Sequence, residues 1–258
     1  MIAGVLLITL LISLSVDWLV RYIPFEYEQQ LVQKYEPELK DRDEVDAYLQ
    51  ILADELAVAM ELPAGMKITV HYVNDDTVNA FATLGGHIMV FRGLLEKLPS
   101  ENALIMLLGH EMAHIKLRHP LRAMGKGMVL SVLFSMVLGQ SSDAASQLMS
   151  NAGMMTMLGF SREQEEGADE EGMQAMWRYY HHVAGSLALF DVLQKVTQKQ
   201  GAYVPALLRS HPQTADRITH LREIQKTRGW IAQGTRHLIP ANILEKISTD
   251  KSMLIESK

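Results

Sequence analysis

The stretch that decides the fold is residues 100–120, which read SENALIMLLGHEMAHIKLRHP. Ser100 suits the N-cap of a helix because its hydroxyl can accept a backbone N–H, and Glu101 places a negative charge in the first turn. The apolar side chains that follow predict a buried helix. We expect His119-Pro120 to end this helix because proline has no backbone N–H to donate.

Within this helix His110, Glu111 and His114 form the pattern HExxH. Side chains four residues apart project from one helix face, so the two imidazoles can bind one cation. Zinc accepts neutral imidazole nitrogen at about 2.0–2.1 Å in a tetrahedral arrangement. Glu111 lies a fraction of a turn away and can face the attacking water without binding the metal. The pattern therefore predicts a zinc site with Glu111 as the general base.

A catalytic zinc normally has a third protein ligand, and the acidic residues 161–169, SREQEEGAD, can provide it. Glu165 and Asp169 are four residues apart and share a helix face. That spacing suits one carboxylate on the metal and a second that accepts the N–H of a ligand histidine. Gly167 and Ala168 are small enough to let this helix approach the HExxH helix closely. The neighbouring acids are interpreted as a solvated face: Glu163, Glu166, Glu170 and Glu171.

The rest of the pattern predicts an α+β chain that is mostly helical, with a small three-stranded sheet beside the HExxH helix. Residues 43–62 repeat apolar side chains, Val58 among them, at a helical period. Three short runs then predict a hairpin plus one strand: 67–73, 79–83 and 87–91. Later helices are expected at 161–180, 183–200 and 214–226.

Composition indicates a globular protein and excludes several functions. Apolar residues make up 48% and charged residues 21% of the chain, which is not the composition of a disordered protein. The net charge of −6 and the lack of a basic stripe argue against a nucleic-acid partner. The chain has no cysteine, which excludes a disulfide framework, a cysteine-ligated zinc and a cysteine nucleophile.

The first residues, MIAGVLLITLLISLSVDWLV, are almost all apolar and long enough to span a bilayer as a helix. No Lys or Arg precedes the run and no clear Ala-x-Ala site follows it, so an uncleaved anchor is favoured over a signal peptide. Truncation from a longer parent is a further alternative. We divide the chain into a membrane anchor, or signal-like segment, at 1–20 and a zinc metallopeptidase domain at 21–258. The apolar run 128–138 is short, and fits a buried helix or a membrane-leaning hairpin better than a second span.

Four motifs in order carry a family resemblance. They are Val78–Ala82 with 85–88 and 93–95, HExxH, the motif SRxxExxAD at 161–169, and Ser210-His211-Pro212 followed by Arg217. The chain resembles the membrane-associated HExxH zinc metallopeptidases that include HtpX, BepA and the CAAX prenyl protease type 1. The resemblance covers residues 27–228 and implies a zincin-like fold of the gluzincin type. It also implies that Glu165 is the third zinc ligand and that Asp169 orients a ligand histidine, His110.

The single apolar span makes the chain resemble the periplasmic branch of that family. The resemblance therefore implies a single-pass protein of the bacterial membrane with a periplasmic catalytic domain. Arg21 and Lys34 follow the span, and counting them alone would place this side in the cytoplasm.

The expected reaction is hydrolysis of a peptide bond. The metal would polarise the scissile carbonyl, and Glu111 would take a proton from water and deliver it to the leaving amine. From the resemblance, His211 would either donate to the developing oxyanion or bind the metal and hold the site shut. A loop histidine without a catalytic role is the alternative. We expect the substrate to pair as an extended strand with Asn79, Ala80, Phe81 and Ala82.

Three functions remain open. One is an endopeptidase acting on unfolded or misassembled membrane or envelope proteins, in protein quality control. Another is a zinc-containing, chaperone-like binding module with little proteolysis, and the third is a zinc hydrolase of a non-peptide amide. The intact Glu111 favours the first, since a pure binder needs no general base.

Other residues are given structural interpretations. His71 and His87 are expected at the surface, and His119 at a helix end. The methionines, Met154, Met155 and Met157 among them, are expected to be adaptable core residues.

Overall fold

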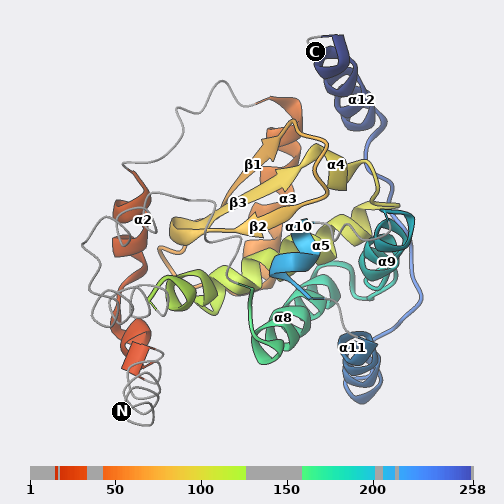
Figure 1. Cartoon of the computed structure of the whole chain (residues 1–258). Helices are drawn as coiled ribbons and strands as arrows, with labels where there is room; N and C mark the ends of the chain where they lie inside the picture. Colours follow the sequence, from red (N-terminus) through yellow and green to blue (C-terminus); the bar gives the residue numbers. More distant parts are fainter. Residues whose placement is uncertain are drawn as a thin grey trace, which may run out of the picture.

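A small mixed sheet lies beside the HExxH helix in the computed structural model of the chain (Figure 1), which describes residues 15–16, 18–33, 43–125, 159–200, 206–212 and 215–256. The strands are β1 (Thr69–Val73), β2 (Ala80–Ala82) and β3 (His87–Phe91), in the order β1-β3-β2. β3 pairs parallel with β1 and antiparallel with β2. The predicted hairpin plus one strand, and the mostly helical α+β class, are confirmed.

The hairpin between β2 and β3 turns through η2 (Leu84–Gly86), where Gly85 and Gly86 have φ of 76° and 90°. A Cβ on Gly86 would lie 2.0 Å from the Lys67 carbonyl oxygen, so only glycine fits there. The prediction that His71 and His87 lie at the surface is wrong for His71, which is buried. Its Nε2 lies 2.8 Å from His87 Nδ1 because β1 and β3 are neighbours.

Three capped helices form the framework around the sheet. They are α3 (Glu44–Ala59), α5 (Glu101–Lys116) and α8 (Arg162–Tyr180). Asp43, Ser100 and Ser161 are their N-caps, and each side chain accepts a backbone N–H from the first turn. α3 packs on β1, while α5 packs on β2 and most extensively on α8. One prediction for α3 is wrong, because Val58 is 79% exposed near the end of the helix.

α5 ends earlier than the sequence predicts. Its last residue is Lys116, and Arg118 turns the chain with a φ of 61°. Residues 119–125 then begin another helical segment, so His119-Pro120 starts a helix instead of ending one. Proline suits this position because the first helical turn needs no N–H from it.

The C-terminal part of the described chain adds four helices. They are α9 (Ala188–Gln200), α10 (Ala206–Ser210), α11 (Ala215–Thr227) and α12 (Ala241–Glu256). α9 begins later than predicted, because residues 184–187 form turns. α11 packs on α8, and α12 packs on α3. α10 lies beside β2 (Figure 1), where the Leu207 N–H donates to the Val78 carbonyl over 3.4 Å.

The N-terminal segment lies beside the residues that follow α5. It comprises η1 (Val20–Tyr22) and α2 (Phe25–Gln33). Val20, Leu84 and Leu121 form a separate small apolar cluster, to which Val16 also contributes. Among the described residues no helix has the length and apolarity needed to cross a membrane. Residues 1–14, the run 128–138, and Met154, Met155 and Met157 lie outside the described residues, so the predictions made for them are not tested.

A candidate metal centre

The two histidines of HExxH meet one turn apart on the buried face of α5. His110 Nε2 and His114 Nε2 lie 3.0 Å from each other. His114 is fully buried, and His110 is nearly so. The helix is held by its Ser100 cap and is apolar along most of its length, so its position is fixed by the core on all sides. The pattern therefore brings both imidazole nitrogens together on one face of the helix.

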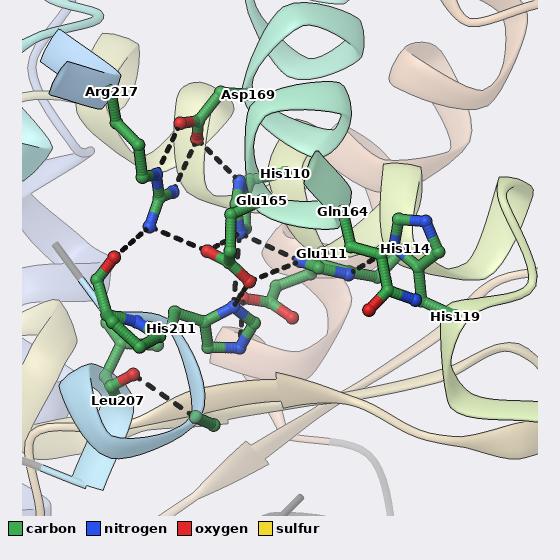
Figure 2. Close-up of polar contacts among 12 residues, drawn as sticks. His110, Glu111, His114, His119, Gln164, Glu165, Asp169, Leu207, His211 and Arg217 are labelled. Atoms are coloured by element: carbon green, nitrogen blue, oxygen red, sulfur yellow. Dashed lines mark hydrogen bonds and ion pairs between the residues drawn. The ribbon is translucent and has the colours of Figure 1, made fainter. Parts of the chain in front are cut away.

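Two further donors reach that point from other parts of the chain (Figure 2). Glu165 on α8 places Oε1 3.4 Å from His114 Nε2 and Oε2 3.6 Å from His110 Nε2. His211, directly after α10, places Nδ1 2.9 Å from Glu165 Oε1 and 3.3 Å from His110 Nε2. Glu165 is 1% and His211 is 4% exposed, so water does not compete for these donors.

The spacing of these donors fits a tetrahedral metal ion. One donor atom from each of the four residues lies within 4.8 Å of all the others. Bonds of about 2.0–2.1 Å to a tetrahedral ion require donor–donor separations of about 3.3–3.4 Å. Five of the six pairs of side chains have separations of 2.9–3.6 Å, with Glu165 facing His114 and His211 through Oε1 and His110 through Oε2. His110, His114, Glu165 and His211 therefore fit a divalent cation without rearrangement of the backbone.

Glu111 lies beside the donor cluster but does not join it. Its carboxylate is fully buried, and neither oxygen has a hydrogen-bond partner within the described residues. His211 Nε2 lies 3.8 Å from Glu111 Oε1. A buried carboxylate without a donor is costly, so this arrangement is one that a bound water or metal would relieve. The adjoining cavity has a volume of about 20 Å³, which is room for about one water and not for a peptide.

Asp169 lies behind His110, on the side away from the donor cluster. Its Oδ1 is 2.9 Å from His110 Nδ1, which is the contact that the resemblance implies. Arg217 on α11 binds the same carboxylate with Nε and Nη2, at 2.7 and 2.8 Å. Arg217 Nη1 also lies 2.7 Å from Glu165 Oε2 and donates to the Pro212 carbonyl over 2.9 Å. One guanidinium thus fixes two carboxylates and the loop that carries His211.

The sequence did not assign a role to Arg217, although its spacing after His211-Pro212 was part of the resemblance. The prediction about small residues between α5 and α8 also needs correction. The close approach is made by Gly109 and Gly172, because a Cβ on Gly172 would lie 2.9 Å from the backbone nitrogen of His110. Among the described residues, a Cβ on Gly167 would have only Leu117 Cδ1 nearby, at 3.7 Å.

The electrostatics favour, at His114 and Glu165, the protonation states that a metal requires; at His211 burial opposes protonation, but the Glu111 and Glu165 carboxylates raise its pKa. Burial lowers the pKa of His114 well below its usual range, so its imidazole is neutral. Burial opposes ionisation of Glu165, but the charge on His211 and the hydrogen bonds from His114 and His211 hold its pKa well below the usual value. Neutral imidazole and ionised carboxylate are the forms that bind metal.

β2 is an edge strand of the sheet and packs on α5, the helix that carries His110 and His114. The Thr83 N–H donates to the His87 carbonyl, and the Phe91 N–H donates to the Asn79 carbonyl. Along an antiparallel pair, hydrogen-bonded residues alternate with residues that point away. Ala80 and Ala82 therefore direct their backbone N–H and C=O groups to the open edge, where Val78 already meets α10. Asn79 is buried, and its side-chain oxygen has no partner among the described residues.

A buried His/Glu cluster that can hold a metal, on a helix beside a small mixed sheet, defines a metal-binding site in a zincin-like fold. The model of Peptidase family M48 matches residues 43–225 of the chain, more than half of its length. The chain therefore belongs to peptidase family M48.

Named relatives agree with this assignment. The Beta-barrel assembly-enhancing protease of Yersinia pestis is 28% identical over 165 residues, which are 59% of this chain and 33% of the relative. The Mitochondrial metalloendopeptidase OMA1 of Schizosaccharomyces pombe is 28% identical over 169 residues, 64% of this chain and 49% of the relative. The Metalloendopeptidase OMA1 of Danio rerio is 28% identical over 207 residues, 76% of this chain and 42% of the relative. The chain thus spans a third to a half of the length of these relatives.

Proposed function

We propose that this chain is a zinc-dependent endopeptidase with His110, His114 and Glu165 as metal ligands. The observation that carries the proposal is the buried donor cluster, with the Glu111 carboxylate beside it that has no hydrogen-bond partner in the described part of the chain. Zinc is the metal chosen because imidazole and carboxylate donors in a tetrahedral arrangement suit it better than magnesium or calcium, which prefer oxygen ligands. Membership of the family supports the assignment to peptidases.

The residues of the chain would divide the reaction among them. A bound zinc supplies Lewis-acid polarisation of the scissile carbonyl. Glu111 takes the proton of the attacking water and delivers it to the leaving amine. Asp169 accepts the Nδ1–H of His110 and so keeps the other ring nitrogen directed at the metal. The outward backbone groups of Ala80 and Ala82 hold the peptide as an added strand, with Asn79 and Phe81 alongside.

His211 has two candidate roles, and the geometry favours that of a fourth metal ligand in the resting protein. With His211 among the donors all four tetrahedral positions are filled by the chain, as in a structural zinc site, and none is open to substrate. α10 also occupies the sheet edge at Val78. The resting site is therefore shut, and the segment carrying His211 must move before a peptide enters.

Replacing His211 distinguishes its two roles. If His211 holds the site shut, His211→Ala raises peptide turnover. If it donates to the oxyanion, the same change lowers turnover by about 10²–10³-fold, the usual loss for one such donor. Unchanged turnover contradicts both roles.

The setting we propose is a bacterial membrane, with the domain on the periplasmic side. Six of the eleven large apolar side chains that are exposed in the described part of the chain lie between residues 18 and 31. Trp18, Tyr22 and Tyr27 are among them, and such aromatic residues are enriched where a protein meets the membrane surface. The substrates we propose are unfolded or misassembled envelope proteins, which the name of the Yersinia pestis relative supports.

The decisive experiment couples metal content to turnover of an unfolded protein such as casein. Wild type should hold one zinc per chain, Glu111→Gln should keep the zinc and lose turnover by about 10²–10⁴-fold, and Glu165→Ala should lose the zinc. All three are measured again in the His211→Ala background, so that a shut resting site does not hide activity. Equal turnover of wild type and Glu111→Gln in both backgrounds would instead support a chaperone-like binding module.

A further inference from the structure

His119 contacts His114 at Nδ1, the ring nitrogen that does not face the donor cluster. Its Nδ1 lies 2.8 Å from His114 Nδ1, and His119 is 3% exposed. The two rings stand edge to face, with centroids 4.9 Å apart. His114 Nε2 is the atom that points into the donor cluster, so His119 contacts the opposite side of the same ring (Figure 2).

We propose that His119 is a positioning residue that holds His114 in the one tautomer able to bind a metal. The inference rests on the metal site of the proposed function. When His114 presents its Nε2 lone pair to a cation, its proton must be on Nδ1, and His119 Nδ1 then accepts that proton in a hydrogen bond. The reverse direction, in which His119 donates, would put the proton of a neutral His114 on Nε2 and remove a ligand.

The two ligand histidines are therefore supported by different chemistry. His110 Nδ1 faces the carboxylate of Asp169 at 2.9 Å, whereas His114 Nδ1 faces another imidazole at 2.8 Å. A ligand histidine almost always donates its second N–H to a carboxylate, a carbonyl or water, and that partner fixes the orientation of the ring. His119 would do for His114 what Asp169 does for His110.

The surrounding structure places the His119 ring for this contact. Arg118 adopts a φ of 61°, which ends the turn after α5 and brings the next residue back toward the helix. Phe160 stacks on the ring of His114, with the two centroids 4.1 Å apart and the planes inclined by 22°. The Phe160 N–H donates to the Ser210 carbonyl, directly before His211. The ring of His114 is thus held by His119 at its edge and by Phe160 on its face.

A buried histidine pair can also be purely structural, and the chain contains a matched control. His71, which is buried, and His87, which is partly buried, form a second histidine pair at 2.8 Å on β1 and β3. Replacing one member of each pair separates an effect on the metal from the general effect of losing a buried histidine.

The test uses His119→Leu, His119→Asn and His71→Leu in the full chain. Zinc affinity is measured by competition with a chromophoric chelator, ligand geometry by the visible spectrum of the cobalt form, and folding by thermal unfolding after removal of metal. We expect His119→Leu to weaken zinc binding about 10–100-fold and to change the cobalt spectrum. His119→Asn, whose amide oxygen can accept the same N–H, should bind zinc within a few fold of wild type, and His71→Leu should not change zinc affinity.

Three outcomes would overturn the inference. One is unchanged zinc affinity in His119→Leu, another is a failure of His119→Asn to restore binding, and the third is an equal loss of affinity in His71→Leu. A wild-type chain that binds no metal would instead contradict the proposed function. Binding and turnover in wild type with an unaffected His119→Leu would contradict this inference alone.

Discussion

Asp169 makes two buried contacts at once, and each depends on its charge. It accepts the Nδ1–H of His110 and binds Arg217 through both oxygens. Burial alone would oppose its ionisation, but the hydrogen bonds from His110 and Arg217 outweigh burial and hold the pKa of Asp169 below its usual value. Residues that support a metal ligand in this way therefore affect both metal binding and folding.

Asp169→Asn should weaken both metal binding and the stability of the fold. The amide is a poorer acceptor for the His110 N–H, so zinc affinity should fall about 10–100-fold. Arg217 would remain buried with only Glu165 as a carboxylate partner, and the free energy of unfolding should drop by on the order of 3 kcal/mol. Chelator competition measures the first effect and urea unfolding of the metal-free chain measures the second. Wild-type values in both measurements would contradict the role given to Asp169.

Sequence alone could predict the residues whose positions relative to each other are set by one helix. The four-residue spacing within 110–114 places two imidazoles together whatever the rest of the fold. Arg217 and His119 could not be assigned in this way, because their contacts depend on how α11 and the turn at Arg118 pack on α5 and α8. His119 was also misread because the proline after it was expected to end a helix, whereas it lies in the first turn of one.

At the scale of elements, the contact between α5 and α8 brings Glu165 to the histidines. Gly172 allows this helix contact, since a Cβ at that position would lie 2.9 Å from the backbone nitrogen of His110 and 3.1 Å from the carbonyl carbon of Gly109. Backbone atoms cannot turn aside as a flexible side chain can. The separation of the two helices, and with it the size of the donor cluster, is set at this glycine.

Gly172→Ala should therefore destabilise the chain by about 1–3 kcal/mol, the usual cost of overpacking, and weaken zinc binding. Gly167→Ala is the matched control on the same helix, where the added methyl meets only Leu117 Cδ1 at 3.7 Å. That change should stabilise the chain by about 0.5–1 kcal/mol, because alanine favours helix more than glycine does. Thermal unfolding of both variants checks the difference, and equal effects would contradict this account of the contact.

The edge strand β2 gives a second prediction at this scale. Ala82→Pro removes an N–H that points to the open edge and leaves the bonds to β3 in place. Casein turnover should fall at least tenfold, with zinc content and unfolding temperature near wild type. Thr83→Pro removes the N–H that donates to His87, so that variant should lose stability as well. Normal turnover by Ala82→Pro would exclude the edge as the substrate strand.

Element boundaries were predicted less well than element types. β2 has only three residues, and α9 begins five residues after the predicted start. Val58 follows the helical period of α3 but lies near its C-terminus, where no other element covers it. Periodicity describes which face a helix could bury, whereas the packing of later elements decides how much of that face is covered.

For the whole molecule, the exposed aromatic residues of the N-terminal segment allow a test of the proposed membrane setting. Trp18 is 57% exposed, whereas Trp230 is buried and Trp177 is packed against the core, and the chain has three tryptophans in all. In vesicles containing lipids brominated near the headgroups, only Trp18 should be quenched. Trp18→Phe should therefore remove the quenching. Quenching that persists in this variant would contradict the proposed contact.

The order of the donors along the chain has a consequence for biosynthesis. The histidine pair comes first, Glu165 follows on α8, and Arg217, which fixes Glu165 and Asp169, comes last. A nascent chain that has emerged only as far as α5 can offer two imidazoles and no more. The ribosome must therefore extend the chain beyond α11 before the donor cluster and its Arg217 support can assemble, so an unfinished copy lacks the complete site.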